Sequence, residues 1–196
     1  MEKDILINYK FEGKKLEVIT FPDPILSKKA LPVENFDGEL LELCKNMLYT
    51  MYKAPGIGLA APQIGISHRF FVLDVDYDRE KVTTSDGTED YSYTDFNPLI
   101  VINPVFKEMS GESIREEGCL SVPGVYEEVK RSSDVLIEYQ DLKGEKHELR
   151  ADGLLAICLQ HEFDHLEGKI FLERLSLLKR NFFKKKLIKA KMRDNE

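Results

Sequence analysis

The sequence is poor in cysteine and has no long apolar run. Its three cysteines are Cys44, Cys119 and Cys158, a sparse and odd-numbered set in a chain of 196 residues. Such a set argues against a disulfide framework and is typical of a reducing compartment. No segment reaches the roughly 18 consecutive apolar residues that span a bilayer, and charges interrupt the N-terminal segment where a signal peptide would be apolar. We therefore expect a cytoplasmic protein without a membrane anchor.

The sequence also lacks internal repeats, low-complexity segments and an excess of positive charge. Its net charge is -7, which argues against general nucleic-acid binding. With 42% hydrophobic and 32% charged residues, the composition is that of an ordinary globular protein. A chain of this length can bury a core of its own, so we expect residues 1–196 to form a single domain.

The segment 154–168 carries the main chemical signal, the letters HEFDH at 161–165, which match the pattern H-E-x-x-H. On an α-helix, residues four apart lie on the same face, so His161 and His165 can bind one metal ion. Glu162 then lies beside the metal without binding it. The same pattern can occur by chance on a surface helix. Here the preceding residues are apolar and predict a helix buried on all sides, where an unpartnered polar side chain costs about 1 to 3 kcal/mol.

The remaining sequence predicts an α+β fold. Apolar positions three and four residues apart predict a helix over 37–53, and apolar or alternating runs predict strands over 69–75, 99–106, 129–139 and 145–149. Residues 1–15 are expected to form an N-terminal arm, and the polar, acidic segment 76–98 an inserted exposed loop. These elements predict antiparallel or mixed β-sheets around the central helix at 154–168.

A basic C-terminal helix is expected over 175–196, which is rich in lysine, arginine and good helix formers. Two alternatives explain its charge. It is either a solvated surface helix or a surface that docks onto something anionic, such as the ribosome.

Two further segments supply candidates for a complete metal site. A catalytic metal needs three protein ligands and one open position. After His165 the chain has only Glu167 and Glu173 and no further histidine, so the third ligand of the large H-E-x-x-H peptidases is poorly matched. Cys119, in a turn framed by glycine and proline, is the better candidate. Gln63 is the one polar side chain in an apolar run, so it either caps its own loop or faces a site.

Three segments together resemble the signatures of the peptide deformylase family. The chain has G-I-G-L-A-A-P-Q at 56–63, E-G-C-L-S at 117–121 and Q-H-E-F-D-H at 160–165, in the order found in that family. The resemblance extends from about residue 16 to the C-terminal helix. It implies hydrolysis of the formyl group from the N-terminal formyl-methionine of newly synthesised polypeptides, with release of formate. Formylated nascent peptides are then the expected partners.

The resemblance also implies a metal centre with a water in the fourth position. The implied ligands are Cys119, His161 and His165. Family members commonly use Fe(II), and a thiolate with two imidazoles also suits zinc, nickel or cobalt. Glu117, just before the Gly-Cys pair, is expected to be held by Arg131.

The implied mechanism uses three further groups. Glu162 takes a proton from the water and later gives it to the departing amine, while the Gln63 amide and the Leu120 N–H stabilise the oxyanion. For Cys158, ordinary helix packing is an equal alternative to a role in the pocket. The residues expected to bind the extended peptide or its methionine side chain are Ile57, Gly58, Gly118, Leu154, Ile157 and Cys158.

Three other functions stay compatible with parts of the sequence. A zinc endopeptidase would share H-E-x-x-H but would not need Cys119 as a ligand. A structural-metal module would need a fourth protein ligand, and no further cysteine or histidine is well placed for it. A ribosome-docking protein without activity would depend on the basic segment 175–196 alone.

Overall fold

The computed structural model describes residues 9–83 and 88–194. These residues form an α+β fold, as predicted. The α-helices are α1 (Gly38–Lys53), α2 (Gly153–Leu166) and α3 (Leu177–Asp194). The strands are β1 (Gly58–Ala60), β2 (Phe70–Leu73), β3 (Asp78–Thr83), β4 (Glu89–Thr94), β5 (Leu99–Ser110), β6 (Ser113–Cys119), β7 (Val122–Arg131), β8 (Asp134–Gln140) and β9 (Lys146–Asp152).

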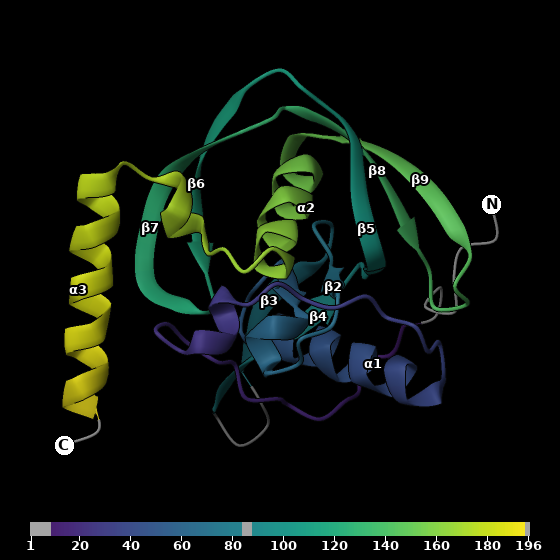
Figure 1. Cartoon of the computed structure of the whole chain (residues 1–196). Helices are drawn as coiled ribbons and strands as arrows, with labels where there is room; N and C mark the ends of the chain where they lie inside the picture. The colour runs from purple at the N-terminus through teal and green to yellow at the C-terminus, as the bar shows by residue number, and fades with distance from the viewer. Residues whose placement is uncertain (1–8, 84–87, 195–196) are drawn as a thin grey trace.

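Helix α2 lies in the middle of the molecule, and strands β5, β8 and β9 curve over it (Figure 1). These strands belong to a five-stranded sheet with the order β1-β2-β5-β8-β9, in which every pairing is antiparallel. Ala156, Leu159 and Leu166 of α2 are buried in one core cluster with side chains of this sheet. The sequence predicted that this helix is buried on all sides, and this prediction is wrong for its first turn. Leu154 in that turn is 44% exposed and lines a pocket.

Helix α1 forms where the apolar periodicity predicts it. The Asp37 side chain accepts hydrogen bonds from the N–H groups of Glu39 and Leu40 and so caps the helix start. Its apolar face, which includes the fully buried Cys44, packs against the other face of the sheet in a second core cluster. The strand expected over 99–106 is present and longer, and Asn103 has a φ of 51° at an irregularity in its pairing with β8.

The strand predicted over 129–139 is divided into two in the structure. Strand β7 ends at Arg131, and β8 begins at Asp134 in a different sheet. The break is held from α2, because the Gln160 side chain accepts a hydrogen bond from the N–H of Ser132 at 3.0 Å and donates to its carbonyl at 2.9 Å. Strand β7 pairs instead with β6, in a hairpin that the sequence patterns did not indicate.

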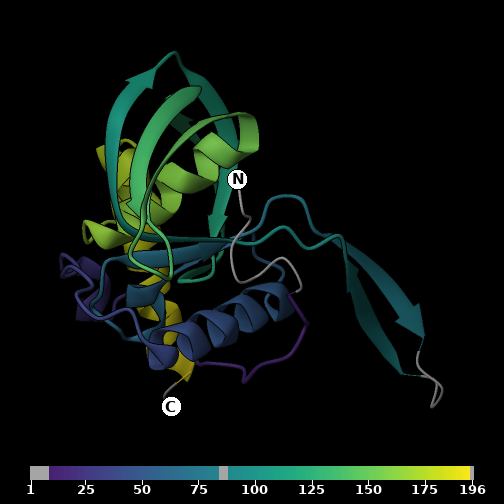
Figure 2. The same ribbon diagram turned by 90° about the vertical axis from the view of Figure 1, so that its right-hand side faces the viewer.

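The inserted segment 76–98 is not an irregular loop. It contains the hairpin of β3 and β4, which extends away from the rest of the molecule (Figure 2). Val82, Tyr91 and Tyr93 are residues that favour strands. The buried Asp74 carboxylate fixes the base of the hairpin, because it accepts hydrogen bonds from the backbone N–H groups of residues 76 and 77 before β3 and of residue 97 after β4. Residues 84–87 of this segment lie outside the described residues.

The terminal segments that the structure describes pack against the core from outside the five-stranded sheet. Residues 9–20 contain no helix or strand, and residues 1–8 of the expected arm lie outside the described residues. Helix α3 lies beside β7 (Figure 1), with Leu187 buried in a third core cluster. None of the helices in the described part of the chain is long and apolar enough to cross a membrane.

Candidate functional site

A pocket of about 470 Å³ lies where three parts of the fold meet. Helix α2 supplies one wall. The other two walls are strand edges. Among residues 9–83 and 88–194, β1 is the last strand of the five-stranded sheet and β6 pairs only with β7, so neither edge has a strand partner on the pocket side. Residues 115–120 along β6 and residues 54–58 leading into β1 all line the pocket.

Three candidate metal ligands come together beside this pocket, and two of them, Cys119 and His161, line it. Cys119 ends β6, whereas His161 and His165 lie one turn apart on α2. Each offers one ligand atom, and these atoms all lie within 4.8 Å of one another. The Cys119 Sγ lies 3.3 Å from the Nε2 of His165. The structure thus brings together a thiol and two imidazoles from distant parts of the sequence, in a set that fits a transition-metal ion.

The electrostatics around the two histidines also suit a cation. Burial and the neighbouring His161 lower the pKa of His165 well below its usual value, so its imidazole stays neutral, the form that binds metals. Burial alone would lower the pKa of His161, but hydrogen bonds with Cys119 and Glu117 raise it well above its usual value. The groups around His161 therefore favour positive charge at this point, whether from a proton or from a metal ion.

Glu117 orients the His161 ring through a hydrogen bond at its Nδ1 atom. Its Oε2 lies 2.8 Å from the His161 Nδ1, which leaves the Nε2 atom for the metal centre. The Arg131 guanidinium donates to both Glu117 oxygens, at 2.8 and 2.9 Å, so the expected Glu117–Arg131 pair is present. Burial alone would raise the pKa of Glu117, but the hydrogen bonds from Arg131 and His161 outweigh it and lower the pKa to about 2. A fixed carboxylate behind a ligating imidazole is a common support for metal sites.

Arg131 also links Glu117 to charged residues closer to the C-terminus. Arg131 Nη1 donates to Asp164 Oδ2 at 2.5 Å, and Arg174 donates to both oxygens of Asp164. The Arg131 side chain is 1% exposed, and those of Glu117 and Asp164 are 5% and 4% exposed. A chain of charges, buried up to Asp164 and partly exposed at Arg174, therefore runs from the candidate ligand His161 to the 3-10 turn Phe171–Arg174 that precedes α3.

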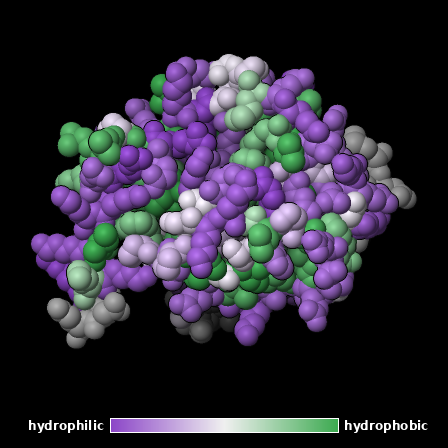
Figure 3. All heavy atoms as spheres, viewed as in Figure 1, coloured by the Kyte–Doolittle hydropathy of each residue, from purple (hydrophilic) through white to green (hydrophobic). Residues whose placement is uncertain are grey.

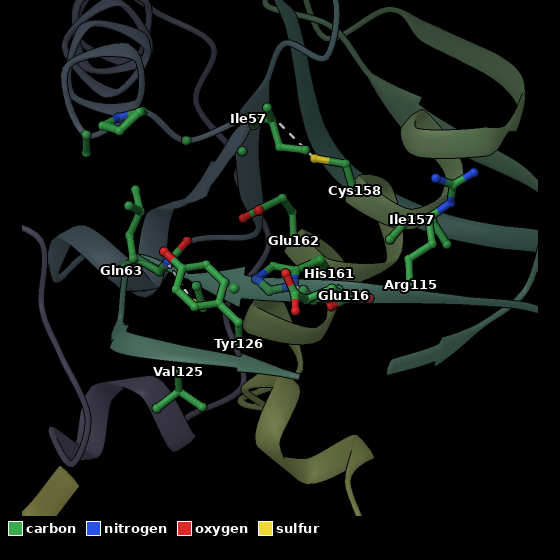
Figure 4. Close-up of a pocket in the computed structure, with 18 of the residues that line it drawn as sticks. Ile57, Gln63, Arg115, Glu116, Val125, Tyr126, Ile157, Cys158, His161 and Glu162 are labelled. Carbon is green, nitrogen blue, oxygen red and sulfur yellow. Dashed lines mark hydrogen bonds and ion pairs between the residues drawn. The ribbon is translucent and has the colours of Figure 1, made fainter. Parts of the chain in front are cut away.

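Glu162 lies beside the ligands with one oxygen free. Burial raises its pKa to about 7, although the charges of His161 and Arg131 act in the opposite direction. Its Oε2 atom is buried and has no hydrogen-bond partner among the described residues. A Cβ at Gly58 would overlap the Glu162 carboxylate, so glycine is required there for the carboxylate to lie against β1. Figure 4 shows Glu162 and His161 together in the pocket.

The Gln63 side chain both caps its own loop and faces the pocket, which are the two roles that the sequence left open. Its Oε1 accepts a hydrogen bond from the Ala60 N–H at 2.8 Å and so caps its own 3-10 turn. Its Nε2 donates to the Ser121 Oγ at 3.1 Å and to the Cys119 Sγ at 3.5 Å, so the amide points to the candidate metal ligands. Leu120, between these two partners, lines the same pocket.

The apolar part of the pocket is formed by the first turns of α2. Leu154, Ile157 and Cys158 all line it, as expected. The Cys158 thiol is buried and donates to the Ile57 carbonyl at 3.5 Å, so this cysteine both packs against the wall and belongs to it. Burial raises the pKa of this thiol well above its usual value.

Several residues of the site could not be identified from the sequence. Arg115, Glu116 and Tyr126 line the pocket, and a Cβ at Gly118 would come within 2.6 Å of the Tyr126 ring. They lie in the β6–β7 hairpin, which the patterns missed, so nothing distinguished them from surface residues. Asp164 did carry a signal, because it is an acidic residue in an otherwise apolar helix segment and so needs buried partners.

Comparisons with known proteins point to one family. A sequence model of the family described as polypeptide deformylase matches residues 15–181. The chain is 48% identical to a peptide deformylase of Novosphingobium aromaticivorans, over 89% of this chain and 96% of that protein. It is 45% identical to a peptide deformylase of Hahella chejuensis, over 91% of this chain and 98% of that protein.

Solved structures match the fold as well. The crystal structure of a peptide deformylase from Legionella pneumophila superposes with a TM-score of 0.78 at 41% identity, covering 93% of this chain and 98% of that one. The peptide deformylase of Ehrlichia chaffeensis in complex with actinonin superposes with a TM-score of 0.77 at 36% identity, covering 90% of this chain and 98% of that one.

Proposed function

The chain belongs to the polypeptide deformylase family, and we propose that Cys119, His161 and His165 hold the metal ion on which this family depends. The protein is a hydrolase that removes the N-formyl group from the N-terminal formyl-methionine of newly synthesised polypeptides and releases formate. The observation that carries the site assignment is the cluster of one thiol and two imidazoles beside the pocket, next to a buried carboxylate. Among the described residues the cluster contains no fourth ligand, which favours a catalytic over a structural ion.

Fe(II) is the ion that we propose for this centre, with zinc, nickel or cobalt able to replace it. One thiolate and two imidazoles suit all four ions. When bound, such an ion lowers the pKa of a water ligand towards neutrality and polarises the formyl oxygen. A thiolate next to Fe(II) is exposed to oxidation, so the active protein should be prepared without oxygen.

Glu162 is the proposed general base. Its free Oε2 accepts a proton from the attacking water, and the same atom later delivers this proton to the nitrogen of the departing peptide amine. A carboxyl group with a pKa of about 7 can make both transfers near neutral pH. Gly58 supports this role because it leaves room for the carboxylate against β1.

Gln63 and the Leu120 N–H are the proposed donors to the oxyanion that forms at the formyl oxygen. The Gln63 amide already lies against the Cys119 sulfur and is fixed by Ala60 and Ser121, so it needs little reorganisation. Loss of one such donor typically costs about 2.7 to 4 kcal/mol of transition-state stabilisation.

The two open strand edges explain how a peptide would bind. We propose that the substrate lies extended between β1 and β6 and pairs with backbone near Ile57, Gly58 and Gly118, which is recognition by strand addition. The methionine side chain then enters the apolar part of the pocket on α2. The residues proposed to line that part are Leu154, Ile157 and Cys158.

For the cellular setting we propose the cytoplasm, with docking onto the ribosome through α3. Three cysteines without disulfide bonds suit a reducing compartment. On α3, Lys185, Lys186 and Lys189 are exposed. Figure 3 shows apolar atoms among polar ones over the edge of the molecule where α3 lies, and Leu178 and Phe182 are 82% and 63% exposed. Such a mixed basic and apolar helix face can bind structured RNA and protein together.

The test is formate release from formyl-Met-Ala-Ser by protein purified without oxygen, with acetyl-Met-Ala-Ser as the matched control. We expect formate from the formylated peptide, an intact acetylated peptide, and about one equivalent of a divalent transition metal by elemental analysis. Cleavage inside either peptide would support an endopeptidase. The absence of formate from metal-replete protein would contradict the proposed site.

A further inference from the structure

Arg115 lies in the pocket wall, and no described residue forms an ion pair with it. It is an exposed residue on β6, four positions before the candidate ligand Cys119, and it lines the pocket. In Figure 4, Arg115 and Gln63 lie on opposite sides of the pocket. The Arg115 guanidinium forms no ion pair with any residue in the described ranges 9–83 and 88–194. A free cation at the wall of a peptide pocket can select among substrates by charge.

The carboxylates closest to Arg115 along the strand do not neutralise it. Glu117 points to the same face of β6 as Arg115, because side chains two apart on a strand share a face, but its oxygens are bound by Arg131 and His161. Glu116 leaves β6 on the opposite face, and although it also lines the pocket it forms no ion pair with Arg115 among the described residues. The positive charge therefore stays available to a ligand that approaches from the α2 side of β6.

The register of an extended peptide indicates which substrate residue meets Arg115. In the binding mode proposed above, the formyl group lies at the Cys119 end and the methionine side chain points to α2, the side of β6 that Arg115 and Glu117 share. Successive side chains of an extended peptide alternate, so the third substrate residue points the same way as the methionine. Three residues at about 3.3 Å each cover roughly 10 Å, and Arg115 lies about 13 Å along β6 from Cys119. The Arg115 side chain is long enough to span the difference between these two lengths.

We propose that Arg115 is a specificity-determining residue that selects formylated peptides with an acidic side chain at the third position. The inference rests on the proposed function, because it uses the same pocket and peptide direction. The carboxylate of the third residue pairs with the guanidinium at the open side of the pocket, where water screens it. The preference is therefore modest in size and falls with added salt.

The test compares three peptides with amidated C-termini, formyl-Met-Ala-Glu, formyl-Met-Ala-Gln and formyl-Met-Ala-Lys. For the wild type we expect kcat/KM to be about two- to five-fold higher with Glu than with Gln, mainly through KM, and lowest with Lys. The ratio should approach one in R115Q and invert in R115E. Because each ratio is measured within one variant, the fraction of active protein cancels.

Two controls make the outcome specific. Lys130→Gln removes a neighbouring exposed cation of the hairpin, which pairs with Glu112 outside the pocket, and it should keep the wild-type ratio. Moving the acid to the second residue, in formyl-Met-Glu-Ala against formyl-Met-Gln-Ala, should give no preference for acid. Equal rates for the three peptides, or an equal preference in R115Q, would overturn the role of Arg115 while leaving deformylation intact. No formate from any peptide would instead refute the proposed function.

Discussion

Replacing Arg131 by methionine removes the cation from the middle of the buried ion network. Arg131 makes two hydrogen bonds to Glu117 and one to Asp164, and its side chain is 1% exposed. Methionine has a similar length but no charge, so the Glu117 carboxylate becomes a buried charge with only His161 beside it. Breaking a buried ion pair from one side typically costs about 3 to 5 kcal/mol.

This cost has a measurable size in thermal unfolding. For a domain of this length, each kcal/mol shifts Tm by about 2 to 4 °C, so Arg131→Met should lower Tm by roughly 6 to 20 °C. Circular dichroism at neutral pH measures the shift, and urea unfolding gives the free energy directly. The same variant should bind its metal about 10- to 100-fold more weakly, because Glu117 no longer holds His161 in a fixed orientation.

Lys130→Met is the matched control. Lys130 precedes Arg131 on β7, but its side chain is 66% exposed and pairs with Glu112 at the surface. Its loss should change the free energy of unfolding by less than about 1 kcal/mol. Adding Glu117→Gln to Arg131→Met removes the unpaired carboxylate and should recover part of the stability. If Arg131→Met were as stable as Lys130→Met, the network would contribute nothing and the reasoning would be refuted.

Three further predictions concern the pocket and the core. Gly58→Ala displaces the carboxylate packed against β1 and should lower kcat at least about ten-fold, whereas Gly38→Ala, with no atom within 4 Å of the added Cβ, should leave kcat unchanged in the same formate assay. Tyr77→Phe removes the hydrogen bond to the Gly56 carbonyl at 3.0 Å and should raise KM more than it lowers kcat. The free energy of unfolding, measured in urea, should fall by about 0.5 to 1.5 kcal/mol. An unchanged KM would show that the β3–β4 hairpin does not position the pocket wall. Burial raises the pKa of Cys44 to about 12, so its thiolate fraction is small below that pH and it should resist a thiol reagent at pH 8 until the protein is unfolded; labelling of native protein at this residue, identified by mass spectrometry, would contradict its burial.

The parts of the fold that follow from local patterns could be predicted from the sequence. Helix α1 carries its periodicity and its Asp37 cap within one short segment, and α2 carries two candidate ligands one turn apart. Once Cys119 is recognised in its turn, the ligand set needs only that this turn meets α2. The Glu117–Arg131 pair could likewise be expected, but only from the family resemblance, and the structure contains it.

The parts that depend on distant contacts could not be predicted. Residues 129–139 look like one strand, because only Ser132 and Ser133 separate its two parts. The break is set by Gln160 of α2, which forms hydrogen bonds with the backbone of Ser132. The β6–β7 hairpin follows from that break. For the same reason Arg115 and Tyr126 had no signal, since the pocket wall exists only after β6 has paired with β7.

The most direct test of the metal centre and its base is Glu162→Gln, assayed for formate release and metal content in one preparation. The glutamine keeps the shape of the side chain beside Gly58 but cannot accept the proton. The account predicts a loss of kcat of about 100-fold or more, with metal content equal to that of the wild type. Formate release at the wild-type rate, or loss of the metal together with activity, would contradict the assignment of Glu162 as a base that does not bind the metal.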